Sequence, residues 1–281
     1  MIPIKSKREI AYLRKAGELV SQTLAEVAKY IRPGVTTAEL DQIAEDFIRS
    51  AGAEPAFKGY RVGRLEFPAT LCISVNEVVV HGIPSDYVLQ EGDIVSVDCG
   101  VRLNGYYGDS AYTFAVGDIT PEKKRLLRVT REALERGVQQ AIVGKRIGDI
   151  SHAIQQHAES AGYGVVKELV GHGIGRKLHE EPQVPNYGSP GTGKKLREGM
   201  TLCIEPMINM GTDRVITDAD QWTVRTADGK PSAHYEYMVA VQKGHPELLS
   251  TFEYIEAITG VPYQEEVVVA QKEKNGEAEE Y

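Results

Sequence analysis

A motif that occurs twice is the feature that most constrains the fold of this chain. Each copy reads Leu-x-Glu-Gly, continues through a short apolar stretch and ends in one acid; the copies are Leu89 to Asp98 and Leu196 to Glu205. The apolar stretches have the length of buried strands. Matching strands that each deliver an acid from the same end favour two structural halves whose carboxylates meet at one place, as a multi-metal or acid/base centre requires.

The repeat extends to the segments that precede these strands. Apolar residues at steps of three and four, from Ile10 to Ile31, predict a helix that ends near Pro33. Thr36-Thr-Ala-Glu39 is a capping box, which predicts that a second helix starts there. Shifted by 110 residues, the same landmarks recur in the second half: Gly34, Glu39, Leu40 and Ser50-Ala51-Gly52 match Gly144, Asp149, Ile150 and Ser160-Ala161-Gly162.

Two helices followed by antiparallel strands, present twice, predict an α+β domain in which the strands line an internal face and the helices lie outside. We expect a single catalytic domain over residues 1–252, with pseudo-two-fold halves at about 1–116 and 117–250. The remaining residues, 253–281, are a predicted C-terminal extension that is polar and charged from about Gln264 and partly flexible.

Composition and charge argue against several classes of protein. The formal net charge of -8 and the lack of a long basic run argue against direct nucleic-acid binding. No apolar run approaches the roughly 20 residues that span a bilayer, and no secretory signal is seen. We therefore expect a cytoplasmic protein without membrane association. Cys72, Cys99 and Cys203 lack close-pair spacing, so we expect buried thiols rather than disulfides or a structural zinc site.

Asp98 and Asp109 can be placed on one face of a predicted hairpin. Asn104-Gly105 is the preferred two-residue turn, so Asp98 should face Ala111 and Asp109 should face Gly100. Because side chains alternate along a strand, the two acids are then diagonal neighbours, roughly 7 to 8 Å apart by backbone. Two carboxylates at that separation can bind one cation between them.

Further potential ligands follow in the second half. His172 and His179 lie in a glycine-rich segment, 171–182, which disfavours a helical zinc motif and allows close backbone approach to a metal or ligand. Glu205 and Glu236 lie on strands that correspond to those of the first two acids. A set of carboxylates with one imidazole suits Mn, Fe or Co ions at two adjacent positions. A pair of such ions can deprotonate a bridging water and polarise a carbonyl. These residues therefore predict hydrolysis.

With these residues in place, the sequence resembles the type I methionine aminopeptidases, whose fold is a duplicated α+β domain called pita-bread. The likeness covers about residues 1–250 and implies an antiparallel sheet that lines a dinuclear metal site, with helices outside. The motifs that carry the likeness are Asn76 to Pro84, Val97 to Gly100, Gly108-Asp109, Gly171 to Gly175, His179 to Val184, Ile204-Glu205-Pro206, Trp222 to Thr226 and Tyr235-Glu236.

The resemblance implies two divalent metal ions as cofactors, and the sequence leaves Co, Mn, Fe and Zn open. Asp98 would hold one ion, and His172 and Glu205 would hold the other. Asp109 and Glu236 would be ligands of both. A hydroxide that bridges the two ions would then attack the scissile carbonyl of the substrate.

The resemblance also implies three residues that act on the substrate. Glu205 would shuttle the proton of the attacking water, His179 would hydrogen-bond the scissile carbonyl, and His81 would meet the second residue of the substrate. An apolar pocket would bind the methionine side chain. Its matching positions are Tyr60, Phe67, Cys72, Leu178 and Trp222.

Two departures from the family concern this pocket. The chain between Tyr60 and Phe67 looks longer than the usual loop, which puts the position of Tyr60 in question. Leu178 stands where the family commonly has Phe, which should widen the pocket. An apolar pocket discriminates by only about 1 to 3 kcal/mol per methylene, so we expect looser selectivity for methionine.

The implied substrates are the N termini of nascent polypeptides with a small second residue. We expect a monomer that could meet them at the ribosome. Two alternatives stay open. A proline-specific aminopeptidase or prolidase shares the fold and the ligands, although it usually carries a large N-terminal domain. A metal-free pita-bread protein would bind partners without catalysis.

Overall fold

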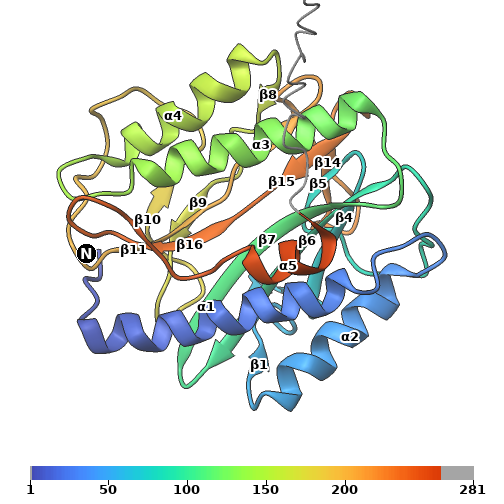
Figure 1. Cartoon of the computed structure of the whole chain (residues 1–281), viewed down its shortest axis with the longest axis horizontal. Coiled ribbons are helices and arrows are strands. Elements are labelled where there is room, and N and C mark those ends of the chain that lie inside the picture. Colours follow the sequence, from blue (N-terminus) through green and yellow to red (C-terminus); the bar gives the residue numbers. More distant parts are fainter. Residues whose placement is uncertain (1, 261–281) are drawn as a thin grey trace, which may run out of the picture.

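Two pairs of helices cover the outside of the molecule, at opposite edges of the strands in Figure 1. The computed structural model describes residues 2–260, so the predicted extension beyond residue 260 lies outside the described residues. The first pair is α1, Lys7–Ala28, and α2, Thr37–Ser50. The second pair is α3, Pro121–Gln139, and α4, Ile147–Ser160. The helices therefore lie outside and the strands inside, as the repeat predicts.

The helices of the first pair begin at capping boxes. Glu9 N donates to Ser6 Oγ at 3.3 Å, and Ser6 N donates to the Glu9 carboxylate at 2.9 Å. The predicted box of α2 is present as well: Glu39 N donates to Thr36 Oγ1 at 3.1 Å, and Thr36 N donates to the Glu39 carboxylate at 2.7 Å. α1 ends at Ala28, before the predicted end near residue 33, because the following backbone bonds run from i to i−3 and turn the chain.

The predicted repeat is present at the level of elements. α2 and α4 are each 14 residues long and start 110 residues apart (147 minus 37). The turns before them contain Gly34 and Gly144, whose φ angles of 92° and 100° are rarely adopted by residues with a side chain. β6, Ile94–Leu103, and β11, Thr201–Ile204, start 107 residues apart (201 minus 94). The boundaries of the two halves stay a prediction.

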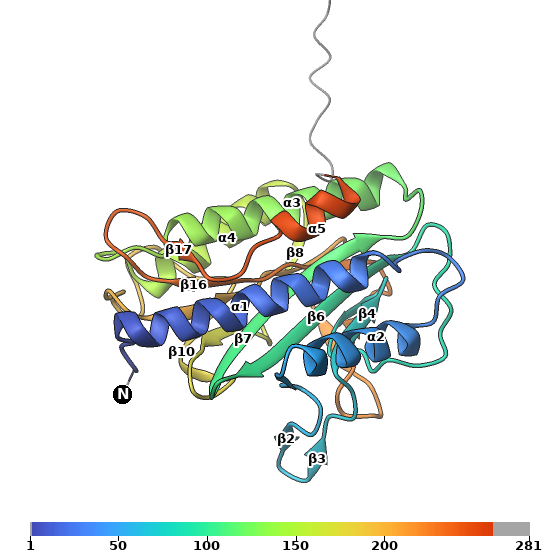
Figure 2. The ribbon, with the colours of Figure 1, turned by 60° about the horizontal axis from the view of Figure 1, so that its bottom comes forward.

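The first half contributes an antiparallel sheet built around the long hairpin of β6 and β7, Tyr106–Ala115. β6 also pairs with β4, Leu71–Val75, and with β1, Glu54–Pro55. Asp98 faces Ala111 and Gly100 faces Asp109, so the predicted register is confirmed. α1 packs across this hairpin (Figure 2).

The second half contributes a five-stranded antiparallel sheet in the order β10-β9-β11-β16-β17. Apart from β11, its strands are β9, Gly171–Gly173; β10, Glu180–Val184; β16, Tyr237–Ala240; and β17, Glu247–Leu248. β7 is hydrogen-bonded to the residue that precedes β16: Glu236 N donates to Ala111 O at 2.9 Å, and Ser110 Oγ donates to Glu236 O at 2.7 Å. These bonds hold acid-bearing strands of the two halves together.

Smaller sheets complete the described fold. One contains β8, Gly164–Val165, β12, Met207–Asn209, and β15, Ser232–His234; another contains β5, Val78–Val80, β13, Val215–Thr217, and β14, Val224–Thr226. β2, Arg61–Val62, and β3, Leu65–Glu66, form a hairpin that projects away from the helices (Figure 2). Among the described residues, no helix is long and apolar enough to cross a membrane.

The main hydrophobic core joins the two halves, since residues such as Val20, Val97, Leu134 and Ile204 belong to one buried cluster. A short helix from the predicted C-terminal extension also contributes. This helix, α5, Glu253–Thr259, packs on α1. The described part of the extension is therefore attached to the body of the fold.

Candidate functional site

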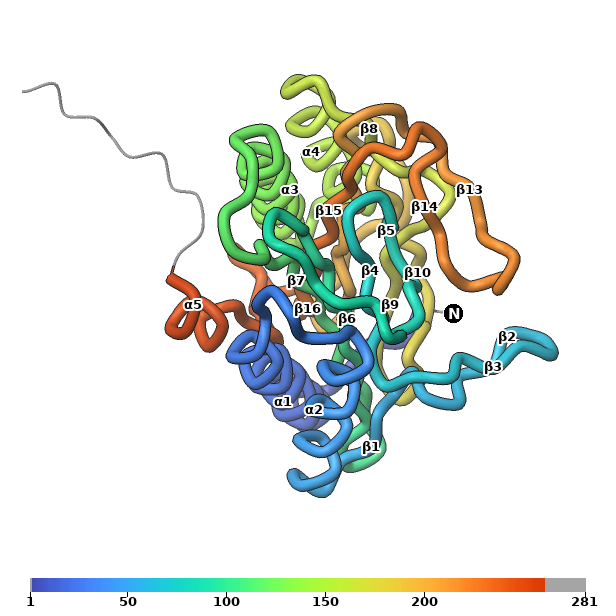
Figure 3. The backbone as a smooth tube through the Cα atoms, turned by 90° about the vertical axis from the view of Figure 1, so that its right-hand side faces the viewer, coloured from blue at the N-terminus to red at the C-terminus, as the bar shows by residue number. Residues whose placement is uncertain are grey.

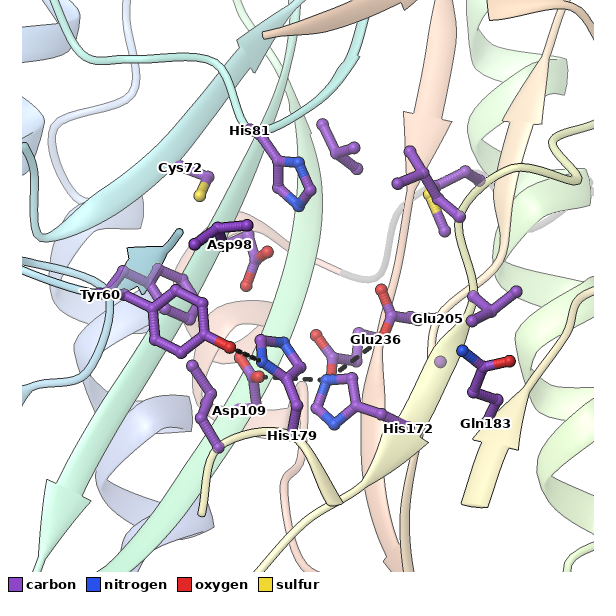
Figure 4. Close-up of a pocket in the computed structure, with 18 of the residues that line it drawn as sticks. Tyr60, Cys72, His81, Asp98, Asp109, His172, His179, Gln183, Glu205 and Glu236 are labelled. Atoms are coloured by element: carbon purple, nitrogen blue, oxygen red, sulfur yellow. Dashed lines mark hydrogen bonds and ion pairs between the residues drawn. The ribbon is translucent and has the colours of Figure 1, made fainter. Parts of the chain in front are cut away.

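Every residue that the sequence assigned to the site lines one cavity of about 780 Å³ (Figure 4). The residues come from both halves of the chain: Tyr60, Phe67, Cys72, His81, Asp98, Asp109, His172, Leu178, His179, Glu205, Trp222 and Glu236. The predicted metal ligands and the predicted apolar pocket therefore share one space.

The strands of both sheets carry the acids into this cavity. Asp98 and Asp109 lie on β6 and β7, Glu205 follows β11, and Glu236 precedes β16. His172 lies on β9, and its Nε2 is 3.5 Å from Glu205 Oε1 and 3.7 Å from Asp109 Oδ2. Figure 4 shows the imidazole facing these carboxylates. The structure thus brings the five predicted ligands together.

The glycines on either side of His172 have a structural reason. A side-chain carbon at Gly171 would lie 2.3 Å from Cys203 O, and one at Gly173 would lie 2.3 Å from Glu181 O. Larger residues are excluded because β9 runs between β10 and β11. The close approach that the glycines allow is therefore between the backbone of β9 and the neighbouring strands. This packing positions His172.

Burial raises the pKa of each acid in the cluster. The pKa of Asp98 rises from its ordinary value of 3.8 to about 6, chiefly because of burial, and the nearby His234 opposes the rise. The pKa values of Asp109, Glu205 and Glu236 are raised well above the usual range, first by burial and then by the negative charge of neighbouring acids. Without a cation, these carboxyls therefore hold their protons to higher pH than ordinary carboxyls do, and they titrate together.

Burial has the opposite effect on the histidines of the cavity. It lowers the pKa of His172 to about 3 and the pKa of His81 to about 4. It also lowers the pKa of His179. All three imidazoles are therefore neutral at neutral pH. A neutral imidazole offers one nitrogen as a metal ligand or acceptor and one N–H as a donor.

The donor set fits a divalent cation. Within residues 2–260, Asp98 Oδ1, Asp109 Oδ1 and Glu236 Oε1 are buried and have no hydrogen-bond partner. Buried polar atoms nearly always have a partner, and a cation would satisfy these oxygens. Ligand atoms of Asp109, His172, Cys203 and Glu236 also lie within 4.8 Å of one another. Metal binding would relieve the repulsion between the acids and release their protons.

Sequence reasoning did not assign two residues that the structure places at this cluster. His234 is 1% exposed, and its Nε2 lies 3.6 Å from Glu205 Oε2. Cys203 is buried, which raises the pKa of its thiol well above the ordinary value, and it hydrogen-bonds Glu236. Strand alternation could have indicated Cys203, which lies on β11 two residues before Glu205.

The long segment between Tyr60 and Phe67 forms the β2–β3 hairpin and does not displace its ends. Tyr60 N donates to Phe57 O and Phe67 N donates to Tyr60 O, each at 2.9 Å. Phe67 meets Trp222 edge-on, with ring centroids 5.3 Å apart. Figure 3 shows this hairpin and the β13–β14 hairpin, whose connection contains Trp222, on the side away from α5. The two hairpins therefore bring Phe67 and Trp222 together at the cavity, and binding of methionine there stays a prediction.

Leu178 also lines the cavity. Leu178 is 3% exposed and belongs to the same buried cluster as Phe67 and Cys72. The predicted apolar pocket therefore exists as a contiguous surface, and its selectivity stays a prediction.

The sequence matches metallopeptidase family M24 over residues 11–243. It is 54% identical over 254 residues to a methionine aminopeptidase of Clostridium acetobutylicum, a match that covers 90% of this chain and 100% of the relative. It is 50% identical over 250 residues to methionine aminopeptidase 1 of Bacillus subtilis, covering 89% of this chain and 99% of the relative.

Solved structures agree with these matches. A methionine aminopeptidase of Rickettsia prowazekii superposes with a TM-score of 0.87 at 41% identity, covering 89% of this chain and 100% of that one. One from Thermotoga maritima gives 0.86 at 46% identity, with the same coverage. A prolidase of Pyrococcus horikoshii gives 0.72 at 25% identity, covering 89% of this chain and 64% of that one. The chain therefore belongs to metallopeptidase family M24 and, within that family, to the methionine aminopeptidases.

Proposed function

We propose that this protein removes the N-terminal methionine from polypeptides whose second residue is small, in a reaction that depends on divalent metal. The observation that carries the proposal is a single cavity in which unpartnered buried carboxylate oxygens lie beside an apolar pocket. The high identity to methionine aminopeptidases supports the choice of substrate. The proline-specific relatives are less similar, and this chain spans only 64% of the prolidase described above.

The five ligand candidates would hold two ions, drawn from Co, Mn, Fe and Zn. Asp98 would belong to one ion and His172 and Glu205 to the other, with Asp109 and Glu236 shared. When bound, such ions supply Lewis acidity, which makes water more acidic and polarises the carbonyl of the substrate. Cellular supply decides between metals that accept the same set of ligands.

Three side chains would act on the substrate directly. Glu205 takes the proton from the attacking water and passes it to the leaving amine. His179 donates a hydrogen bond to the scissile carbonyl oxygen as negative charge develops there. His81, which also lines the cavity, meets the second residue of the substrate.

The methionine side chain would enter the apolar part of the cavity, between the following residues: Tyr60, Phe67, Cys72, Leu178 and Trp222. The main chain of the substrate would then pass between His81 and His179. There the two imidazoles would favour a small second side chain over a large one. Leu178 is smaller than phenylalanine, so some other apolar side chains should also be accepted.

The natural substrates would be new polypeptides, met at the ribosome in the cytoplasm by a monomeric enzyme. The net charge of -8 supports recognition of the polypeptide rather than of nucleic acid.

The test is to remove metal from the protein, restore each metal separately and follow methionine release from Met-Ala-Ser and Met-Leu-Ser. The proposal expects metal-dependent release from Met-Ala-Ser and little from Met-Leu-Ser. Glu205→Gln should slow release by about 10²- to 10⁴-fold, and Glu198→Gln, at an exposed surface acid, serves as the matched control. Equal cleavage of both peptides, release with no metal, or cleavage confined to Xaa-Pro dipeptides would contradict the proposal.

A further inference from the structure

His179 has a hydrogen-bond partner that the proposed reaction does not yet use. Tyr60 Oη lies 2.7 Å from His179 Nδ1, and the two rings meet edge-on with centroids 5.2 Å apart and an interplanar angle of 72°. Figure 4 shows this contact at the edge of the cluster of acids. The contact occupies Nδ1, so Nε2 is the ring nitrogen that remains for the cavity.

Tyr60 is held from its backbone. Its N–H donates to Phe57 O, and its carbonyl accepts from Phe67 N, both at 2.9 Å. Gly59 N also donates to Phe67 O at 2.9 Å. These bonds close the base of the β2–β3 hairpin at the point where Tyr60 leaves it. The backbone of Tyr60 is therefore fixed, and its phenol extends from it to His179.

The segment that carries His179 is fixed by a separate set of contacts. Glu180 Oε1 accepts hydrogen bonds from Arg176 N at 2.9 Å and from Lys177 N at 3.2 Å. The same carboxylate forms an ion pair with Lys5, and both side chains are largely buried. Donor and acceptor thus come from two independently anchored segments, and little ordering is needed to form the bond between them.

We propose that Tyr60 is a positioning residue whose hydroxyl donates to His179 Nδ1 and thereby keeps the imidazole proton on Nε2. This inference rests on the proposed role of His179 toward the scissile carbonyl. A neutral imidazole has one N–H, so a ring that accepts at Nδ1 must donate from Nε2. In other active sites, too, the hydrogen bond made by one ring nitrogen of a histidine determines whether the other nitrogen carries the proton.

The phenol is suited to this role. Burial raises the pKa of Tyr60, which keeps its O–H protonated at working pH. If the hydroxyl were absent, both tautomers of His179 would be accessible. The fraction of rings with Nε2–H would fall, and with it the fraction of enzyme that can donate to the developing oxyanion.

The experiment is Tyr60→Phe, which removes the hydroxyl and keeps the ring in the pocket wall. Full-length protein with ¹⁵N-labelled histidine, loaded with Zn²⁺, is studied by long-range ¹⁵N–¹H NMR, and His179→Gln identifies the signals of His179. We expect wild type to show protonated Nε2 and acceptor Nδ1, and Tyr60→Phe to show a mixture of tautomers. With Met-Ala-Ser, we expect kcat to fall about 5- to 10-fold, the effect of one hydrogen bond, and KM to change less than twofold.

Tyr254→Phe is the matched control, because it also deletes a hydroxyl bonded to a side chain, Glu18, at 3.2 Å. That hydroxyl lies on α5, which Figure 3 shows away from the β2–β3 hairpin, so both readouts should stay at wild-type values. A proton on Nδ1 in the wild type would overturn the inference, as would an unchanged tautomer in Tyr60→Phe. An effect on KM alone would also overturn it, because Tyr60 would then only help to bind the substrate as part of the pocket wall. If wild type released no methionine with any metal, the proposed function would fail, whereas the NMR result would still decide what Tyr60 does to the ring.

Discussion

Replacing Asp98 with asparagine should stabilise the metal-free protein by an amount that depends on pH. Burial raises the pKa of Asp98 from 3.8 to about 6, so folding favours the protonated acid. A group whose pKa is higher in the folded state stabilises the fold fully at pH values below its unfolded pKa. This stabilisation is lost as the pH rises through the folded pKa. The loss therefore occurs between about pH 4 and about pH 6, and the cost is fully present at neutral pH.

The size of the effect follows from this difference in pKa. Each unit of difference between the folded and unfolded pKa corresponds to about 1.4 kcal/mol. Above pH 6, the ionised carboxylate therefore lowers the free energy of unfolding by at most about 3 kcal/mol. Asp98 is partly exposed to the open space of the cavity, where solvent can screen its charge. The value is therefore an upper limit. Asparagine has the same size and carries no charge, so it avoids the cost. Changes in packing are similar at both pH values and cancel in the comparison.

The assay is urea unfolding of wild type and Asp98→Asn in the presence of EDTA, at about pH 4 and about pH 7.5. The stability of the variant relative to wild type should increase by up to about 3 kcal/mol between these conditions. Asp86→Asn, at an exposed acid, should show no such increase. A relative stability that is equal at both pH values, or that moves in the opposite direction, would refute the claim that burial makes the ionised form of Asp98 costly in the metal-free protein.

Three further substitutions test other parts of the account. Glu205→Gln should lower kcat for Met-Ala-Ser by about 10²- to 10⁴-fold, and a loss below tenfold would remove Glu205 from proton transfer. Lys5→Met leaves the carboxylate of Glu180 buried without its ion-pair partner. It should lower the free energy of unfolding by about 3 to 5 kcal/mol, whereas Lys243→Met, at an exposed pair, should have little effect. Leu178→Phe narrows the pocket and should raise the ratio of kcat/KM for Met-Ala-Ser over Leu-Ala-Ser about tenfold; an unchanged ratio would show that position 178 does not set selectivity.

The features that could be predicted from sequence are those that local rules determine. The Asn104-Gly105 turn sets the hairpin register, and strand alternation then puts Asp98 and Asp109 on one face. The capping residues mark the start of α2, and the repeat relates it to α4. The roles of individual residues are a different matter, because they came from the resemblance to a family and not from periodicity.

The contacts between distant segments could not be predicted in this way. Tyr60 and His179 are 119 residues apart, and no local pattern links them. The extra residues after Tyr60 put its position in question, but they form a hairpin with its own backbone bonds, and Tyr60 lines the cavity. The position of His234 could not be predicted because β15 ends at this residue and β16 begins after Glu236, so no single strand carries both residues.

The central claim is that the buried acids and His172 hold the metal on which methionine release depends. The most direct measurement titrates Mn²⁺ or Co²⁺ into metal-free protein and records bound metal and methionine release from Met-Ala-Ser in the same samples. We predict two ions per chain at saturation, activity that rises with metal binding, and loss of one ion with loss of activity in Asp98→Ala. Full activity in EDTA, or activity in wild type without bound metal, would contradict the account.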